Sequence, residues 1–139
     1  MLRRTFTAVV ATGLVGLFLA HSAVAGDAKL KFELYKDKAG QFRWRLNAAN
    51  GETLATSGEG YKAKASARKG IEKIRTAADE LTFELYEDKK GEHRFRIEAK
   101  NGKVIGASSE GYKQKASAEK AIQTIKDGAK GSTVSDETT

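Results

Sequence analysis

The sequence predicts an α+β domain made by tandem duplication of a β-β-β-α unit, with a mainly antiparallel sheet and both helices on one face. Three observations indicate this fold. A segment of the chain is repeated, the hydrophobic spacing within each copy changes from two to 3.6 residues, and each helix-period segment has a single apolar face. Because a unit of ~45 residues rarely forms a stable core by itself, we expect the two copies to share one core.

The repeat aligns Phe32–Arg75 with Phe83–Lys126, at an offset of 51 residues, and 24 of the 44 aligned residues are identical without a gap. The clearest shared stretch is Glu-Gly-Tyr-Lys-x-Lys-Ala-Ser-Ala, at 59–67 and again at 110–118. We therefore divide the chain into a first repeat at 26–78, a second repeat at 79–126 and a polar, disordered tail at 127–139.

The first two strands of each unit are predicted from alternation of apolar and polar residues, as in Phe32, Leu34 and then Trp44, Leu46. Gly40 lies where a three-residue hairpin loop needs a left-handed residue. That loop sets Leu34 opposite Trp44 in the first copy. The same loop places Glu33 opposite Arg45 and Tyr35 opposite Arg43, and in the second copy it places Leu85 opposite Phe95 and Glu84 opposite Arg96.

The next turn, Ala49-Asn50-Gly51, is compatible with two registers. A two-residue turn at Asn50-Gly51 pairs Leu46 with Ala55 and turns Leu54 to solvent, whereas a three-residue loop pairs Leu46 with Leu54. Because a one-residue slip moves every side chain to the other face, we choose the register that buries Leu54. The second copy is then expected to pair Ile97 with Ile105.

A helix follows the third strand of each copy, because small and apolar residues recur at i, i+3, i+4 and i+7. Ser66 and Ser117 lie at the expected helix starts, as N-caps or first-turn residues. The segment from Arg75 to Leu81 connects the repeats and can extend the first helix. The predicted buried helix positions are Ala67, Gly70, Ile71 and Ile74, and then Ala118, Ala121, Ile122 and Ile125.

The first 25 residues have the pattern of a secretory signal peptide. Arg3 and Arg4 precede an apolar stretch, and Ala23-Val24-Ala25 is typical of a cleavage site. The uncharged run is shorter than the ~20 residues that span a bilayer, which disfavours a membrane anchor. We expect cleavage near Ala25, giving a periplasmic or secreted protein, and removal of Arg3 and Arg4 lowers the formal charge from +7 to +5.

The residue types disfavour catalysis, and we predict no enzyme, no cofactor and no metal. The 139-residue chain contains no cysteine, which excludes thiolate chemistry, disulfides and cysteine-based zinc sites. After cleavage the only histidine is His93, at a position that aligns with Phe42 at a strand end. Asp37 and Asp88 are typical turn residues. A remote alternative is a carboxylate-based hydrolase that uses Glu59 and Glu110 in one cleft.

The solvent face of the sheet is the candidate binding surface, because arginines interleaved with tyrosines suit contact with anions. Glu33 and Glu84 lie opposite two of these arginines, so internal pairing is the competing interpretation. If all four arginines are ion-paired, this face is excluded as a binding site. The candidate residues are Tyr35, Arg43, Arg45, Tyr86, Arg94 and Arg96, together with Tyr61, Lys62, Tyr112 and Lys113 near the helix starts.

We expect a non-enzymatic module whose partner is an anionic polymer, a phospholipid surface or an acidic protein. Export disfavours nucleic acid as the partner, and both a monomer and a homodimer are compatible with the sequence. The alternative is a structural or stress-related protein without a defined ligand, acting through contacts at sheet edges.

The combined motifs also resemble a known family. Phe-Glu-Leu-Tyr, Asp-Lys-x-Gly, Arg-x-Arg, Asn-Gly, Ser-x-Glu-Gly-Tyr and Ala-Ser-Ala with Ile-x-x-Ile occur in both copies, over about Lys29–Lys126. This set resembles the YegP-like family, also called the domain of unknown function 1508. The resemblance implies a tandem β-β-β-α duplication with an intertwined sheet, and it implies no established activity or catalytic residue.

Overall fold

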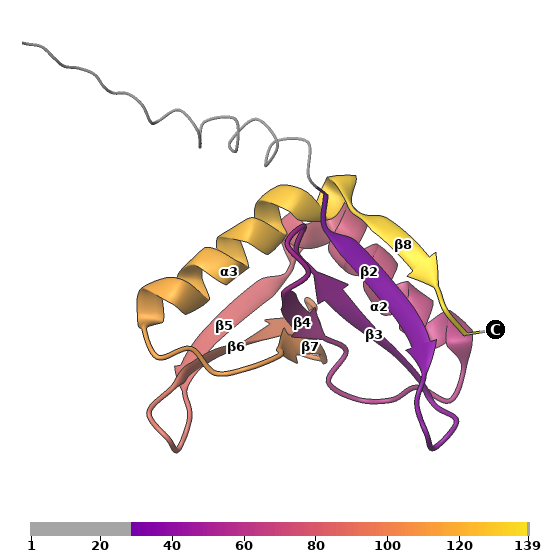
Figure 1. Cartoon of the computed structure of the whole chain (residues 1–139), viewed down its shortest axis with the longest axis horizontal. Coiled ribbons are helices and arrows are strands. Elements are labelled where there is room, and N and C mark those ends of the chain that lie inside the picture. The colour runs from indigo at the N-terminus through magenta and orange to yellow at the C-terminus, as the bar shows by residue number, and fades with distance from the viewer. Residues whose placement is uncertain (1–28, 139) are drawn as a thin grey trace, which may run out of the picture.

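The structure, a computed structural model, describes residues 29–138 (Figure 1). The predicted signal peptide lies outside the described residues. The first repeat contains β2 (Lys31–Lys36), β3 (Phe42–Asn47), β4 (Thr53–Thr56), α2 (Lys64–Ala77) and the 3₁₀ turn η1 (Ala78–Glu80). The second contains β5 (Thr82–Glu87), β6 (His93–Glu98), β7 (Val104–Ser108), α3 (Lys115–Gly128) and the 3₁₀ turn η2 (Ala129–Gly131), and β8 (Thr133–Asp136) follows.

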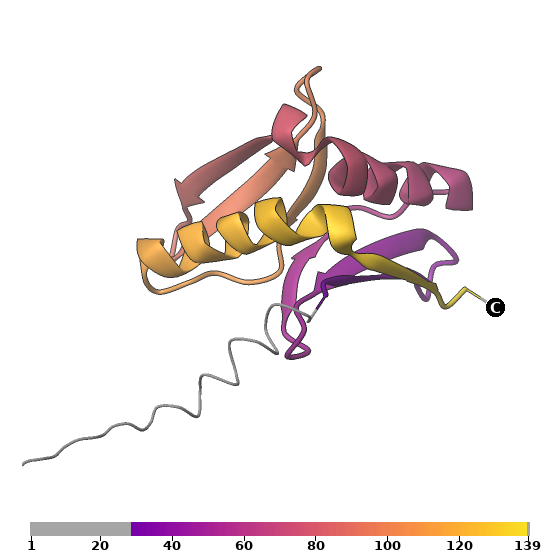
Figure 2. The same ribbon diagram turned by 90° about the horizontal axis from the view of Figure 1, so that it is seen from above.

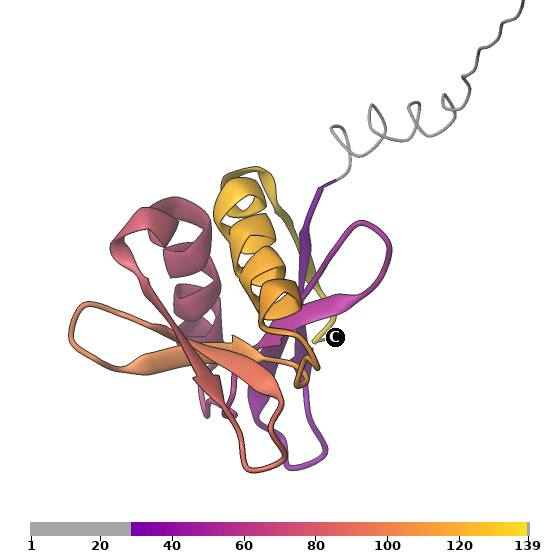
Figure 3. The same cartoon turned by 90° about the vertical axis from the view of Figure 1, so that its left-hand side faces the viewer.

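The strands form one sheet in the order β5-β6-β7-β4-β3-β2-β8. The two repeats meet in the middle, where β4 and β7 pair antiparallel. Both helices lie side by side on the same face of this sheet (Figures 2 and 3). The predicted α+β duplication is therefore confirmed, and among the strands of residues 29–138 only the β2–β8 pair is parallel.

The first hairpin of each repeat has the predicted register. Leu34 pairs with Trp44 and Glu33 with Arg45, and the second copy pairs Leu85 with Phe95. The loop closes as a three-residue turn with Gly40 at φ 81°. The helices also bury the predicted residues of each apolar stripe. Ser66 and Ser117 lie in the first turns, while Ala63 and Gln114 occupy the N-cap positions.

The predicted third-strand register is wrong beyond the turn. The three-residue loop forms as expected, since the Ala48 N–H and the Glu52 carbonyl are 2.7 Å apart and Asn47 pairs with Thr53. The register then shifts at a β-bulge, so that Leu46 pairs with Ala55. The bulge buries both Leu54 and Ala55, a solution that regular alternation cannot supply.

The same correction applies to the second repeat, where Ile97 pairs with Gly106 instead of Ile105. As in the first repeat, the register shift lies next to the pair nearest the turn, between Ile97 and Glu98 of β6. Ile105 and Gly106 are both buried. The bulge is thus a feature of the duplicated unit.

The predicted disordered tail is also corrected. Residues 127 and 128 end α3, and Thr133–Asp136 forms β8, which runs parallel to β2 along the edge of the sheet (Figure 1). The segment has one apolar residue, Val134, too few for an alternation pattern, yet that residue packs on the core. Two cations of α2, Lys64 and Arg68, pair with Asp136 and hold the strand in place.

The core contains one Trp where the second repeat has Phe95. Trp44 is completely buried and meets the Phe32 ring edge-on, with centroids 5.4 Å apart. A Cβ on Gly106 would lie 2.8 Å from Trp44 Cη2, and one on Gly70 would lie 3.3 Å from Trp44 Nε1. The aligned residues in the other copy are Ala55 and Ala121, so the larger ring coincides with two smaller neighbours.

Candidate functional site

The four arginines of the predicted binding face are all ion-paired. Arg45 Nε lies 2.7 Å from a carboxylate oxygen of Glu33, and Arg96 Nη1 lies 2.9 Å from one of Glu84. Arg43 and Arg94 pair at 2.7 Å with the turn residues Asp37 and Asp88. The expectation of unpaired arginines is therefore wrong, because the strands supply a carboxylate to two of them and the hairpin turns supply one to the other two.

The tyrosines of this face are occupied as well. The Arg45 guanidinium carbon lies 4.2 Å from the centroid of the Tyr35 ring, and that of Arg96 lies 3.9 Å from the Tyr86 centroid. Stacking of this kind covers the aromatic face that a ligand would need. The duplicated Tyr/Arg surface is a network of internal contacts in both repeats.

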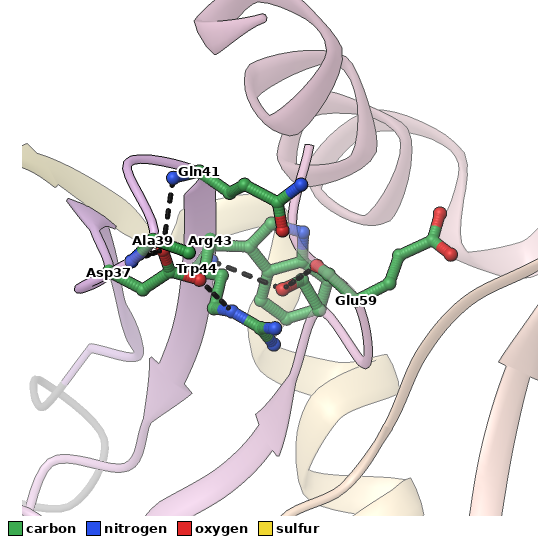
Figure 4. A network of polar contacts seen from close by, with 7 residues as sticks. Asp37, Ala39, Gln41, Arg43, Trp44 and Glu59 are labelled. Carbon is green, nitrogen blue, oxygen red and sulfur yellow. Dashed lines mark hydrogen bonds and ion pairs between the residues drawn. The ribbon is translucent and has the colours of Figure 1, made fainter. Parts of the chain in front are cut away.

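Asp37 organises the first hairpin loop (Figure 4). Its Oδ1 accepts hydrogen bonds from the backbone N–H groups of Ala39 and Gln41, each at 2.9 Å, while Oδ2 accepts one from Arg43. The hydrogen bond from Arg43 and those from the backbone lower the pKa of this carboxyl group. Asp88 makes the same contacts, and the hydrogen bond from Arg94 lowers its pKa.

Tyr61 and Tyr112 connect the helix starts to the sheet. Tyr61 exchanges two backbone hydrogen bonds with Phe42, at 2.7 and 2.8 Å, and Tyr112 does the same with His93. His93 thus has the structural position of Phe42 in the first copy. Burial, and then the nearby Glu59 carboxylate, raise the pKa of the Tyr61 hydroxyl. The adjacent Lys62 and Lys113 are exposed.

Two grooves related by the duplication lie beside these tyrosines, and sequence reasoning missed both. The α2 groove has a volume of about 350 Å³ and the α3 groove about 440 Å³. Each is lined by the helix of one repeat and by the turn between the second and third strands of the other repeat. The α2 groove is lined by Glu59, Tyr61, Ser66, Lys69, Gly70, Lys73, Ala99, Asn101, Lys103 and Ile105.

The two grooves differ in charge. Three lysines and one glutamate line the α2 groove, whereas one lysine and two glutamates line the α3 groove. The difference comes from two aligned pairs, Lys73 with Thr124 and Lys103 with Glu52. Among residues 29–138, no carboxylate oxygen lies within 4.0 Å of the ammonium groups of Lys69, Lys73 or Lys103. These are the uncompensated cations that the predicted arginine face lacks.

The proposed carboxylate pair is not brought into one cleft. Glu59 lines the α2 groove and Glu110 lines the α3 groove, so the hydrolase alternative lacks its required geometry. Within the described part of the chain, no cluster of three or more His, Asp or Glu side chains has the arrangement of a metal site. Neither α2 nor α3 is long and apolar enough to cross a membrane.

Comparison with known proteins gives a consistent result. The family described as "Domain of unknown function (DUF1508)" matches the chain twice, over residues 37–84 and 88–136. Each match ends in the strand that follows a helix, which is β5 for the first and β8 for the second. UPF0339 protein PA0329 of Pseudomonas aeruginosa is 43% identical over 108 residues, which cover 77% of this chain and 96% of that protein.

Two solved structures share the fold. The solution NMR structure of yegP from E. coli, a protein of unknown function, has a TM-score of 0.71 and 36% identity, covering 79% of this chain and 94% of its own. That of UPF0339 protein SO3888 from Shewanella oneidensis has a TM-score of 0.70 and 30% identity, covering 79% and 92%. The names of these relatives state no activity, ligand or partner.

Proposed function

We propose that the chain, which belongs to the DUF1508 family of domains of unknown function, is an exported, non-enzymatic module that binds an anionic partner in the α2 groove. The observation that carries this proposal is the set of three lysines with uncompensated charge. Lys69 and Lys73 lie one turn apart on α2, and Lys103 lies on the turn between β6 and β7. An anion in the groove would therefore meet ammonium groups from both repeats.

Several polar groups favour the same ligand chemistry. The Tyr61 and Ser66 hydroxyls and the Asn101 amide also line the groove and can donate hydrogen bonds. Charge-assisted hydrogen bonds from lysine to phosphate or carboxylate oxygens are stronger than neutral ones. The predicted signal peptide supports a site of action outside the cytoplasm, where anionic envelope components are the available partners.

The experiment is an amide-shift NMR titration of residues 26–139 with pyrophosphate, at low and high salt. We expect shifts at residues 66–73 and 101–105, and we expect high salt to reduce them because ions screen exposed charges. Shifts confined to the Tyr35/Arg45 and Tyr86/Arg96 surface would instead indicate that pyrophosphate binds the solvent face of the sheet and not the α2 groove.

The duplication supplies matched variants for this titration. Lys73→Thr with Lys103→Glu gives the α2 groove the residues of the α3 groove, and we expect binding to be lost. Glu52→Lys with Thr124→Lys makes the reverse exchange, and we expect pyrophosphate shifts to appear around the α3 groove. If the first double variant binds pyrophosphate as well as the unaltered protein does, the lysines do not form the site. If the signal peptide is not cleaved on expression, the proposed export is contradicted, but the proposed anion binding is not.

A further inference from the structure

The two repeats treat their outer sheet edges differently. β2 and β5 are aligned strands, and each is the outermost of the three strands in the β-β-β-α unit of its repeat. β8 covers the outer edge of β2, whereas no strand within residues 29–138 pairs with the outer edge of β5. Phe32 and Leu34 are completely buried, while the aligned Phe83 and Leu85 remain partly exposed.

The covering strand has a defined relation to the repeat. β8 pairs with β2 in a register that sets Lys31 beside Thr133 and Phe32 beside Val134, an offset of twice the repeat length. The β2 edge thus accepts a parallel strand in the position where a third unit would begin. By the same symmetry, the β5 edge has the backbone geometry to accept a parallel strand.

Charge distinguishes the two edges. The covered edge is basic, with Lys29 two residues before β2 and Lys36 at its end, and its covering strand is acidic, with Asp136 at its end and Glu137 directly after it. At the aligned positions the β5 edge has Glu80 and Glu87.

The flanking helix shows this reversal of charge at one position. Arg68 of α2 pairs with Asp136 of β8, and the residue of α3 that aligns with it is Glu119. Arg75 of α2 donates a hydrogen bond to the Ser132 carbonyl at the start of β8, whereas the aligned Lys126 lies 5.4 Å from the Phe83 ring centroid. Lys29, Lys36 and Arg68 of the first repeat thus align with Glu80, Glu87 and Glu119, whereas Lys64 and Arg75 align with Lys115 and Lys126, so the open edge is less basic than the covered one.

We infer that the β5 edge is a docking site for a basic, extended segment of a partner protein, which adds to the sheet as a strand parallel to β5. Backbone hydrogen bonds supply the general affinity in this mode, and alternate side chains supply the selectivity. Apolar residues of the segment would cover Phe83 and Leu85, and its lysines or arginines would meet Glu80, Glu87 and Glu119. The like charge of both sheet edges, at Glu87 and at Asp136, disfavours a second copy of this chain as the occupant.

The probe is a synthetic peptide, Ser-Thr-Val-Ser-Lys-Lys-Thr, which is the sequence of residues 132–138 with lysine at the positions of Asp136 and Glu137, compared with the acidic counterpart Ser-Thr-Val-Ser-Asp-Glu-Thr, each added to residues 26–139. We expect the basic peptide alone to shift the amide resonances of 82–87 and to slow hydrogen exchange there. Glu87→Lys and Glu119→Arg introduce the residues of the first repeat, and we expect each to weaken peptide binding about two- to fivefold. The control is Glu137→Lys, an equal charge change at the opposite edge, which we expect to leave the affinity unchanged.

Three outcomes would overturn the inference. The first is equal binding of the acidic peptide, and the second is an equal loss of affinity in the control variant. The third is protection of 82–87 that rises with protein concentration in the absence of peptide, since a second copy would then cover the edge. If a variant does not fold, the comparison of the two peptides on the unaltered protein decides by itself. Pyrophosphate binding at the α2 groove is independent of all these results.

Discussion

At the residue scale, the one larger aromatic residue of the core is accommodated by smaller residues around it. Trp44 is larger than the aligned Phe95, and its indole lies against Gly70 of its own repeat and Gly106 of the other. The burial of Trp44 could be predicted from strand alternation. Its dependence on Gly106 could not, because that contact joins the two repeats and requires the bulge that sets Gly106 beside Ile97.

Gly106→Ala is therefore expected to destabilise the protein by about 1–3 kcal/mol, the usual cost of overpacking a core. The new Cβ would lie 2.8 Å from Trp44 Cη2 and 3.0 Å from the Thr56 carbonyl oxygen. Urea unfolding followed by far-UV circular dichroism measures this change. We expect Trp44→Phe to recover part of the loss in the double variant, because the other repeat combines Phe95 with Ala55. A neutral Gly106→Ala variant would show that the backbone shifts to make room.

At this scale, two of the four arginine ion pairs could be predicted from the sequence. Hairpin register alone sets Glu33 beside Arg45 and Glu84 beside Arg96, and both ion pairs form. The partners of Arg43 and Arg94 come from turns, where register does not determine the direction of a side chain. Asp37 and Asp88 were therefore predicted as turn residues only, and the sequence did not reveal that they are the carboxylate partners of Arg43 and Arg94.

At the scale of elements, the strands and helices follow from hydrophobic spacing, and the departures from prediction have local causes. The bulge after the second turn allows Leu54 and Ala55 to be buried together, so neither regular register applies. β8 has a single apolar residue and is held by hydrogen bonds along β2 and by ion pairs to α2. Spacing arguments detect neither feature, since both depend on distant parts of the chain.

The hairpin loops make a testable contribution to acid stability. Ion pairing and backbone hydrogen bonds lower the pKa of Asp37 and Asp88 in the folded state below that of the unfolded chain. A carboxyl group of this kind stabilises the fold above its unfolded pKa of about 3.9, and the contribution is lost as the pH falls through the folded pKa. The stability of the unaltered protein should therefore fall more steeply below about pH 4 than that of the Asp37→Ala, Asp88→Ala double variant.

Urea unfolding at a series of pH values tests this expectation. Asp79→Ala is the control, because Asp79 is exposed and lies in none of the ion pairs found within residues 29–138. The difference in unfolding free energy between the unaltered protein and the double variant should shrink on acidification. A difference that stays constant down to about pH 2 would mean that the loops owe nothing to the ionised carboxylates.

At the scale of the whole molecule, the two repeats are interdependent. The α2 groove joins the helix of the first repeat to a turn of the second, and the α3 groove joins the converse pair. The duplication itself was evident from the sequence, but the crossing of repeats in each groove was not. The one available signal was the change of Lys73 and Lys103 to Thr124 and Glu52 between aligned positions, which a chain-wide charge count conceals.

Removal of β8 should therefore affect the entire domain. Truncation after Gly131 exposes the β2 edge and removes the packing of Val134 and the β2–β8 hydrogen bonds. We expect the free energy of unfolding to fall by roughly 2–4 kcal/mol. Urea unfolding of residues 26–131 and 26–139 gives the comparison, and Thr133→Ser, a change at an exposed position of β8, serves as the control for altering this segment without removing it. Equal free energies of unfolding for the two lengths would show that β8 does not stabilise the domain.

The pairing of β8 with β2 also determines when folding can be completed. β8 lies beside β2, about a hundred residues earlier in sequence, so this contact cannot form until β8 has been synthesised. Contacts between sequence-distant strands form slowly, because the intervening chain loses entropy before they are gained. The β2–β8 pair is therefore expected to be among the last contacts to form as the domain folds.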